Sequence, residues 1–340
     1  MKTSDFSFEL PEELIAQKPT QDRGESRLLV LHRDTEELID SAVRHIQDFI
    51  PPNSLMIFNN SKVRKARIYG TSDTGGSVEF LLLSSEDGYS WRCMVKKAKK
   101  QRVGKRFSFE GGKTAVITGE DGEYRILRFD TAADDAYLDA YGHIPLPPYI
   151  KREDTADDAS RYQTVYADPI GSAAAPTAGL HFTPQILEKL RSKGIRTEYV
   201  TLHVGLGTFA PIRTEQIEDH KMHTEEYEIS PPVADAVNAA KMEGRPVFAV
   251  GTTSLRTLES AADENGVVRS GKRSTNLFVY PGFEFRVVDG LFTNFHTPDS
   301  SLILLVSAFG TTGLIKRAYA HAIENRYRFF SYGDAMLILP

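Results

Sequence analysis

The sequence predicts an α/β main domain with a mixed sheet, plus an inserted small antiparallel β-barrel domain. The first observation is a series of short β-branched and aromatic runs between residues 55 and 130. The second is an alternation of strand and helix patterns after residue 195, which indicates an α/β layer with some parallel pairing. The third is the segment 141–160, where prolines and then acidic residues mark an extended exit linker and a surface loop. We therefore assign residues 1–54 and 151–340 to a discontinuous main domain and residues 55–150 to the insert.

The insert is predicted to be built from antiparallel strands. Turn signals such as EGGK (110–113) and EDGE (120–123) fall between the strand-like runs, where tight hairpins need them. Closely spaced strands with little helical periodicity are typical of a small barrel or sandwich. Cys93 lies in one of these runs and is expected to be a small core residue. The predicted strands are 54–60, 66–70, 77–85, 89–97, 106–111, 114–120 and 124–130.

The main domain is predicted to alternate strands with amphipathic helices. Ser230 is a suitable cap, and Pro231 or Pro232 a suitable first-turn residue, for a helix over 231–244. Residues 283–295 are predicted to form a hairpin, because the pair Asp289-Gly290 suits the positive φ angles of a tight turn. The other predicted elements are strands at 195–204, 245–251 and 335–339, and helices at 184–194, 253–266 and 312–329.

The composition is that of an ordinary soluble globular protein, with 41% hydrophobic and 26% charged residues among 340. The longest apolar run, 301–309, is too short to span a bilayer, and the N-terminus lacks the hydrophobic segment of a signal peptide. We therefore expect a cytoplasmic protein that does not engage a membrane. With one cysteine, the chain can form neither an intramolecular disulfide nor a thiolate-rich metal site.

The charge pattern limits how the protein could bind nucleic acid. A net charge of −5 argues against broad electrostatic binding, which needs an excess of Lys and Arg over the whole surface. Two segments could still form a local basic surface: 61–67 has four basic residues, and 96–106 has seven and no acid. A solvated hairpin turn would explain either segment equally simply.

Metal and dinucleotide motifs are weak in this sequence. None of the nine histidines belongs to an HExxH motif, and the tightest group, 220–229, suits a polar site wall or plain surface better than zinc. We therefore predict no metal site. Gly205 and Gly207 form a GxG, but the third glycine of a dinucleotide-binding loop is missing, so they indicate only a turn or a close backbone approach.

The start of the predicted helix after residue 251 is a candidate anion site. Free backbone N–H groups and the hydroxyls of Thr252 and Thr253 would converge there. Arg256 lies in the first helical turn, where its charge opposes the helix dipole, so it needs a partner such as a carboxylate. The alternative is a hydroxyl-capped helix with a surface salt bridge.

Two further segments place polar residues next to a turn or next to a run of small side chains. Asn294 and His296 stand where a predicted strand ends and a turn begins, which is where α/β proteins hold ligands. Residues 171–183 are a run of small side chains that ends in His181-Phe-Thr, and Thr177 and Gly179 within it would leave room for a ligand. A satisfied core histidine is the alternative in both places.

Taken in order along the chain, these segments resemble the S-adenosylmethionine:tRNA ribosyltransferase-isomerase (QueA) family of queuosine biosynthesis. The resemblance covers nearly the whole chain, although no single motif decides it. The matching segments are 9–31, 145–167, APTAGLHFT (175–183), YVTLHVGLGTFAP (199–211), MHTEEYEI (222–229), VGTTSLRTLES (250–260), 275–296 and YRFFSYGDAMLI (327–338).

The resemblance implies an activity. Enzymes of this family transfer and isomerise the ribosyl moiety of S-adenosylmethionine onto 7-aminomethyl-7-deazaguanine in the tRNA anticodon loop. The product is epoxyqueuosine-tRNA, and adenine and methionine are released. In the accepted scheme a base removes a proton from the 5′ carbon, adenine leaves as the sugar opens, and the aminomethyl nitrogen attacks before epoxide closure expels methionine. The scheme uses S-adenosylmethionine as a co-substrate and no metal or prosthetic group.

The resemblance also directs attention to particular residues. Candidates for the proton-transferring groups are the histidines within family motifs, and which is base and which is acid stays open. Candidates for binding S-adenosylmethionine lie in the same motifs, with the helix start at 252–256 suiting the methionine carboxylate. The catalytic candidates are His181, His203, His223 and His296, and the binding candidates are Thr177, Gly179, Gly205, Gly207, Thr252, Thr253, Arg256 and Asn294.

The chain departs from the family pattern at a few positions, and two other functions remain open. NNSKVRKAR (59–67) replaces NDTRVIPAR, which puts in doubt any role for Asn60, and Thr297 changes the wall beside His296. A non-catalytic RNA-binding protein is the main alternative, and an S-adenosylmethionine-dependent methyltransferase is disfavoured because no glycine-rich strand-loop-helix of the usual type occurs. We expect tRNA as the macromolecular partner of a monomer with no obligate protein partner.

Overall fold

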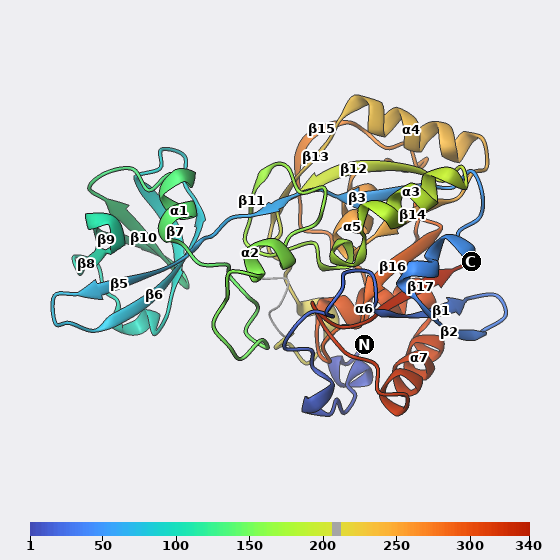
Figure 1. The fold of residues 1–340 in the computed structure, drawn as a ribbon, viewed down its shortest axis with the longest axis horizontal. Coiled ribbons are helices and arrows are strands. Elements are labelled where there is room, and N and C mark those ends of the chain that lie inside the picture. Colours follow the sequence, from blue (N-terminus) through green and yellow to red (C-terminus); the bar gives the residue numbers. More distant parts are fainter. Residues whose placement is uncertain (206–211) are drawn as a thin grey trace.

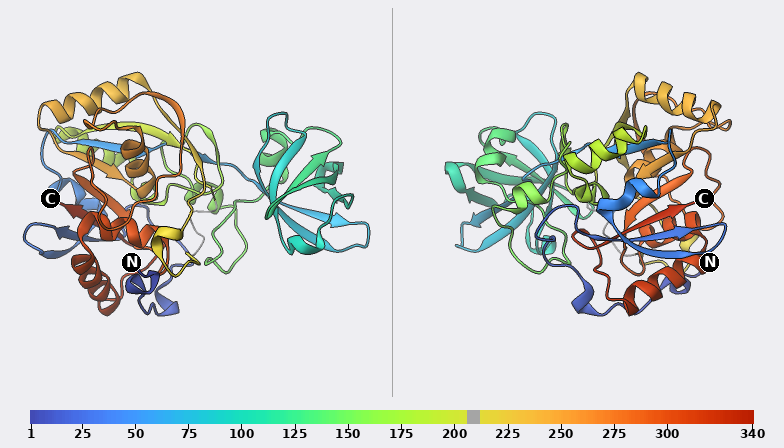
Figure 2. Two further views of the ribbon diagram at one scale, coloured as in Figure 1. Left: turned by 180° about the vertical axis from the view of Figure 1, so that it is seen from behind. Right: turned by 45° about the vertical axis from the view of Figure 1, so that its right-hand side comes forward.

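A computed structural model describes residues 1–205 and 212–340 of the chain. It contains a large α/β unit and a β-barrel that projects from one side of it (Figures 1 and 2). Both chain termini lie on the α/β unit (Figure 1). The predicted fold class, a mixed sheet with a closed antiparallel barrel, is therefore confirmed.

The α/β unit is built on a nine-stranded mixed sheet with the strand order β15-β13-β12-β3-β14-β16-β17-β1-β2. The central strands β12, β3, β14 and β16 run parallel to one another, whereas β13 and β17 pair antiparallel with their neighbours β12 and β16. The strands are β1 (Arg27–His32), β2 (Leu38–Ala42), β3 (Leu55–Asn59), β12 (Arg196–Leu202), β13 (Glu225–Ile229), β14 (Val247–Val250), β15 (Gly271–Thr275), β16 (Gly290–Asn294) and β17 (Ala335–Leu339).

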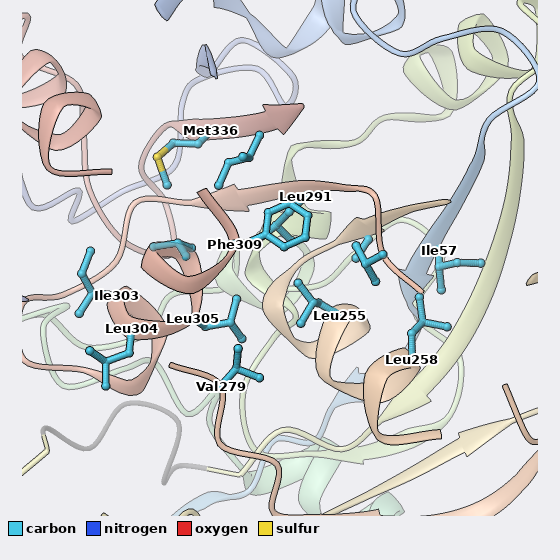
Figure 3. Packing of buried hydrophobic residues seen from close by; sticks show 14 of the residues in the cluster. Ile57, Leu255, Leu258, Val279, Leu291, Ile303, Leu304, Leu305, Phe309 and Met336 are labelled. Carbon is cyan, nitrogen blue, oxygen red and sulfur yellow. The ribbon is translucent and has the colours of Figure 1, made fainter. Parts of the chain in front are cut away.

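Helices cover both faces of this sheet. The larger hydrophobic core lies on the face covered by α4, α5, α6 and α7, where Ile57 of β3 and Leu291 of β16 meet Leu255 and Phe309 (Figure 3). The opposite face packs against α3 and the 3₁₀ segments η3 and η6. The α-helices are α1 (Asp135–Tyr141), α2 (Asp158–Arg161), α3 (Pro184–Ser192), α4 (Pro231–Met242), α5 (Thr252–Ala261), α6 (Ser301–Gly310) and α7 (Thr312–Glu324). The 3₁₀ segments are η1 (Thr3–Phe6), η2 (Glu12–Leu14), η3 (Val43–Asp48), η4 (Ala98–Lys100), η5 (Glu110–Gly112), η6 (Thr177–His181) and η8 (Ile217–Asp219).

The barrel closes in the order β10-β7-β6-β5-β8-β9, with antiparallel pairing throughout. Its interior is filled by side chains such as Phe80, Phe107 and Leu127, and the predicted core residue Cys93 is buried among them. The barrel strands are β5 (Arg67–Ser72), β6 (Ser77–Ser84), β7 (Ser90–Val95), β8 (Arg106–Phe109), β9 (Thr114–Asp121) and β10 (Tyr124–Phe129). The short strands β4 (Lys62–Val63) and β11 (Ile170–Ser172) pair beside the chain segments that lead to and from the barrel.

Two sequence predictions differ from the structure. The segment 54–60 was expected in the insert that begins at residue 55, but β3 pairs with β12 and β14 in the large sheet, so the first barrel strand begins at Arg67. The predicted hairpin over 283–295 was wrong, because β16 pairs with β14 and β17 and not with the segment before Asp289. Glu259 instead accepts hydrogen bonds from the backbone N–H groups of Arg286, Val287 and Val288 and holds that segment away from the sheet ladder.

Among the described residues, no single helix is long and apolar enough to cross a membrane. The bent pair α6 and α7, whose axes differ by 114°, passes that test only when its two helices are counted together, on length and composition alone. Most of the α6 side chains belong to the large hydrophobic core of the α/β unit.

Candidate active site

The carboxyl ends of the parallel strands β12, β3, β14 and β16 meet at one edge of the sheet, where ligands bind in many α/β proteins. Asn59 ends β3, Thr252 opens α5 directly after β14, and Asn294 ends β16. His203 directly follows β12. Most of the residues predicted from the sequence therefore lie at this edge of the sheet, although their side chains do not all face the same cavity.

A cleft of about 710 Å³ lies between this edge and the barrel. The barrel side contributes Arg92 from β7 and Tyr124 from β10, and the Arg92 guanidinium lies 3.7 Å from the centre of the Tyr124 ring. The sheet side contributes residues after β12 and at the start of β13. The lining residues used below are Arg64, Gly171, His203, Gly205, His223, Glu225, Glu226 and Ser274.

His203 is held at the wall of this cleft by its backbone and by close packing. Its backbone N–H donates to the Glu226 carbonyl oxygen at 3.0 Å. A Cβ atom at Gly171 would lie 2.7 Å from the imidazole Cε1, so only glycine leaves room for the ring there. Its buried Nδ1 has no hydrogen-bond partner among the described residues. Burial lowers the pKa of His203, so the ring is neutral near pH 7 and can accept a proton.

Gly205 is fixed by a buried ion pair. Glu225 Oε1 accepts a hydrogen bond from the Gly205 N–H at 3.0 Å, and the other carboxylate oxygen pairs with Arg256 Nη1. Arg256 Nε donates to the Leu277 carbonyl oxygen at 3.0 Å, and Arg256 is only 3% exposed. The carboxylate that Arg256 requires near a helix N-terminus is therefore Glu225. The pair ties the segment after His203 to α5 and to the segment after β15.

The hydroxyls at the start of α5 serve the backbone and the neighbouring strand. Thr253 Oγ1 accepts a hydrogen bond from Asn59 Nδ2 at 3.2 Å, and Asn59 also binds the backbone N–H and carbonyl groups of Leu202. Thr252 and Thr253 are each 7% exposed. Gly251 is the N-cap of α5 and no side chain caps this helix among the described residues, so the hydroxyl-capped alternative does not describe it, and the anion site stays a prediction.

His181 and His296 are buried at the same sheet edge but outside the cleft lining. His181 Nε2 lies 3.1 Å from Asn294 Nδ2, and His296 Nε2 lies 2.9 Å from Thr293 Oγ1. Burial lowers the pKa of each ring to about 3, and Arg328 contributes to the shift at His181. Both rings are therefore neutral near pH 7. His181 borders a separate cavity of about 20 Å³ beside Arg23 and Tyr332.

The run of small residues before His181 mainly packs against the protein itself. A Cβ atom at Gly179 would lie 2.2 Å from the Tyr166 hydroxyl oxygen, and Ala178 lies in the core on the α3 face of the sheet. Thr177 opens η6 and is half-buried. Within this run only Gly171 and Ala173 reach the cleft.

The structure therefore brings part of the predicted set together. His203, Gly205 and His223 line the cleft, and Arg256 stands behind it through Glu225. His181, Asn294 and His296 lie elsewhere on the edge, and Gly207 falls outside the described residues. Residues 1–205 and 212–340 contain no cluster of three or more metal-ligating side chains.

Sequence reasoning missed several residues of the cleft wall. Glu225 and Glu226 were noticed only as part of a polar group, and their alternation along β13 could have assigned one inward and one outward side chain. Arg64, one of the departures from the family pattern, lines the cleft and binds Asp135 at 2.7 Å. The sequence does not mark Arg92 and Tyr124 as cleft residues, because only the folded barrel places them there.

Comparison with known proteins assigns the family. A protein-family model described as queuosine biosynthesis protein matches residues 3–338. S-adenosylmethionine:tRNA ribosyltransferase-isomerase of Treponema denticola is 56% identical, and that of Syntrophotalea carbinolica 49% identical, with full coverage of both chains in each case. The crystal structure of S-adenosylmethionine tRNA ribosyltransferase from Thermotoga maritima aligns with a TM-score of 0.56 at 34% identity, covering 98% of this chain and 100% of that one. The chain thus belongs to the queuosine biosynthesis protein family that the sequence motifs indicated.

Proposed function

We propose that this protein is an S-adenosylmethionine:tRNA ribosyltransferase-isomerase whose reaction takes place in the cleft between the barrel and the sheet. It transfers the ribosyl moiety of S-adenosylmethionine to 7-aminomethyl-7-deazaguanine in the tRNA anticodon loop, and it releases adenine and methionine. The observation that carries the location is His203, whose pKa is lowered by burial and whose side chain lies at the wall of a cleft that both units form.

His203 is the base in this proposal. Removing a proton from the 5′ carbon next to the sulfonium needs a neutral acceptor, and the lowered pKa keeps the imidazole in that form. Glu226, whose backbone carbonyl holds His203, is an exposed carboxylate on the same wall and would attract the positive sulfonium. His223 is the other histidine of the cleft lining and would donate a proton or hydrogen bond to the departing adenine.

The barrel would bind the tRNA backbone. Its basic segment 96–106 is largely exposed and follows β7, whose Arg92 and Met94 line the cleft. Phosphate contacts from such side chains position an RNA without reading its sequence, and the target base is then extruded into the pocket. We further propose that the barrel and the α/β unit are separate domains, that the protein is a cytoplasmic monomer, and that S-adenosylmethionine is a co-substrate with no prosthetic group beside it.

Product analysis tests the function. Incubation with S-adenosylmethionine and tRNA that carries 7-aminomethyl-7-deazaguanine is expected to release free adenine and methionine in equal amounts, measured by chromatography. Release of S-adenosylhomocysteine would indicate a methyltransferase instead. Tight tRNA binding without any product would indicate a non-catalytic RNA-binding protein, and either result would overturn the proposal.

Charge reversal on the barrel should weaken tRNA binding. Replacing Lys96, Lys97, Lys99 and Lys100 with glutamate removes exposed positive charge from the segment after β7, where Lys96 is the one lysine of the four that has an ion pair with a described residue, Glu79 at 3.7 Å. We expect a higher Kd for tRNA and a salt dependence whose log–log slope falls by about 0.7–0.9 for each lost phosphate contact. The affinity for S-adenosylmethionine serves as the control and should not change. An unchanged tRNA affinity would show that the RNA surface lies elsewhere.

A further inference from the structure

A second cavity, separate from the cleft, lies on the segment that follows β15. Its volume is about 530 Å³, within the usual range for ligand pockets. Aromatic rings of Phe278, Tyr280 and Phe283 line it, and each of the three side chains is only partly buried. Arg286 lies on its wall as an exposed side chain with no ion pair among the described residues, and Glu259 and Glu284 also line the cavity.

A β-turn builds part of the aromatic wall. The Phe283 N–H donates to the Tyr280 carbonyl oxygen at 3.1 Å, which closes a four-residue turn. Pro281 and Gly282 occupy its middle positions, and Gly282 has a φ of 103°, as the third residue of a type II turn requires. The turn therefore fixes the backbone positions of Tyr280 and Phe283, which carry the two rings at its ends.

The flanks of this turn are anchored at both ends. Arg256 Nε binds the Leu277 carbonyl oxygen, and Val279 is buried against the core near Leu305 (Figure 3). On the other side, Glu259 Oε1 and Oε2 accept hydrogen bonds of 3.0–3.1 Å from three successive backbone N–H groups. A loop held this firmly loses little conformational freedom when a ligand binds.

Residues that line the cavity follow, within a few positions of the chain, a residue that lines the cleft. Ser274 of β15 lines the cleft, and Leu277, three residues later, lines the cavity. Arg256 contacts both sides, since it binds Glu225 of the cleft wall and Leu277 of the cavity wall. A ligand that occupies the cleft and extends past β15 would reach the aromatic turn.

We propose that this cavity is a stacking subsite for one unpaired RNA base next to the modified nucleotide. The inference rests on the proposed function, which places an anticodon loop in the cleft. Single-stranded bases are bound by stacking on aromatic side chains, with arginine nearby for the backbone or the ring face. The partly exposed rings and the unpaired charge of Arg286 provide both elements.

Tyr280 variants combined with abasic RNA test the subsite. Tyr280→Leu keeps an apolar side chain but removes the stacking face, and Tyr280→Phe restores the ring. Binding of anticodon stem-loops is measured with one loop base at a time replaced by an abasic nucleotide. With the intact loop, Tyr280→Leu should raise Kd about tenfold, which is within the usual contribution of one stacked base, and Tyr280→Phe should recover most of the affinity.

At one loop position, the abasic nucleotide should raise the Kd of the wild type about tenfold. The same abasic loop should not raise the Kd of Tyr280→Leu any further. If every abasic loop weakens the wild type and Tyr280→Leu by the same factor, no base stacks on Tyr280 and the proposal is wrong. If Tyr280→Leu instead weakens S-adenosylmethionine binding and leaves RNA affinity intact, the cavity holds the donor's adenine, which also overturns it. Both results leave the adenine and methionine release of the wild type untouched, so failure of the subsite is distinguishable from failure of the proposed function.

Discussion

His203→Asn is expected to lower kcat by a factor of about 10²–10⁴, the usual contribution of a positioned general base. Asparagine retains a polar side chain of similar width beside Gly171 but cannot accept the 5′ proton. Because the ring makes no hydrogen bond to another described residue, its loss should hardly change folding. The measurement is single-turnover release of adenine, with the Kd of S-adenosylmethionine and of tRNA determined in parallel.

The pH profile gives an independent readout of the same residue. A histidine that acts as a base is active when neutral, and burial lowers the pKa of His203 below its ordinary value of 6.5. The wild-type kcat/KM should therefore fall on the acid side with a midpoint below 6.5, and this limb should vanish in His203→Asn. His321→Asn is the matched control, since His321 of α7 binds Asp40 of β2, outside the cleft lining. Equal losses in the two variants would contradict a catalytic role for His203.

Breaking the buried Arg256–Glu225 pair should cost about 3–5 kcal/mol of folding free energy, because Arg256→Met leaves a carboxylate in a site that is about 95% shielded from water. Urea unfolding measures this loss. Activity should fall as well, since Glu225 Oε1 anchors Gly205 two residues after the proposed base.

The double variant separates stability from positioning. Arg256→Met with Glu225→Met replaces the pair by apolar side chains and should recover much of the stability, because neither charge is then buried without its ion-pair partner. The double variant, unlike Arg256→Met, also lacks the acceptor for the Gly205 N–H, so kcat should be low while stability returns. Recovery of both properties together would show that the pair has only a structural role.

The sequence predicted most elements of the fold because the relevant signals are local. The helix α4 begins at Pro231 and the final strand covers Ala335–Leu339, as the pattern indicated. The assignment of β3 was wrong because the barrel strands, from β5 on, follow it closely in the chain. Its continuous apolar run, Leu55–Phe58, is typical of a parallel strand buried on both faces, whereas β5 alternates buried and exposed residues.

The Asp289-Gly290 signal misled for a different reason. Asp289 Oδ2 accepts a hydrogen bond from the Val247 N–H at 2.8 Å, and Oδ1 binds Lys241 Nζ at 2.9 Å. The aspartate therefore joins β16 to the start of β14 and does not close a hairpin. The sequence around a turn residue does not show that its side chain binds a segment far away in the chain.

The sequence identified the segments that contain the candidate residues, but not which of these residues lie together in one site. Sequence motifs identified four histidines, yet Gly179 packs against Tyr166 and His181 is buried, while Gly171 leaves room for His203 at the cleft. Which glycine admits a ligand and which admits a neighbouring side chain depends on contacts between segments far apart in the chain.

A structure of the protein with bound S-adenosylmethionine would show directly where the reaction takes place. We expect the ribose in the cleft between the barrel and the sheet, with its 5′ carbon within about 3–4 Å of a ring nitrogen of His203. A ligand bound beside His181 or His296, with His203 out of reach of the 5′ carbon, would contradict this expectation.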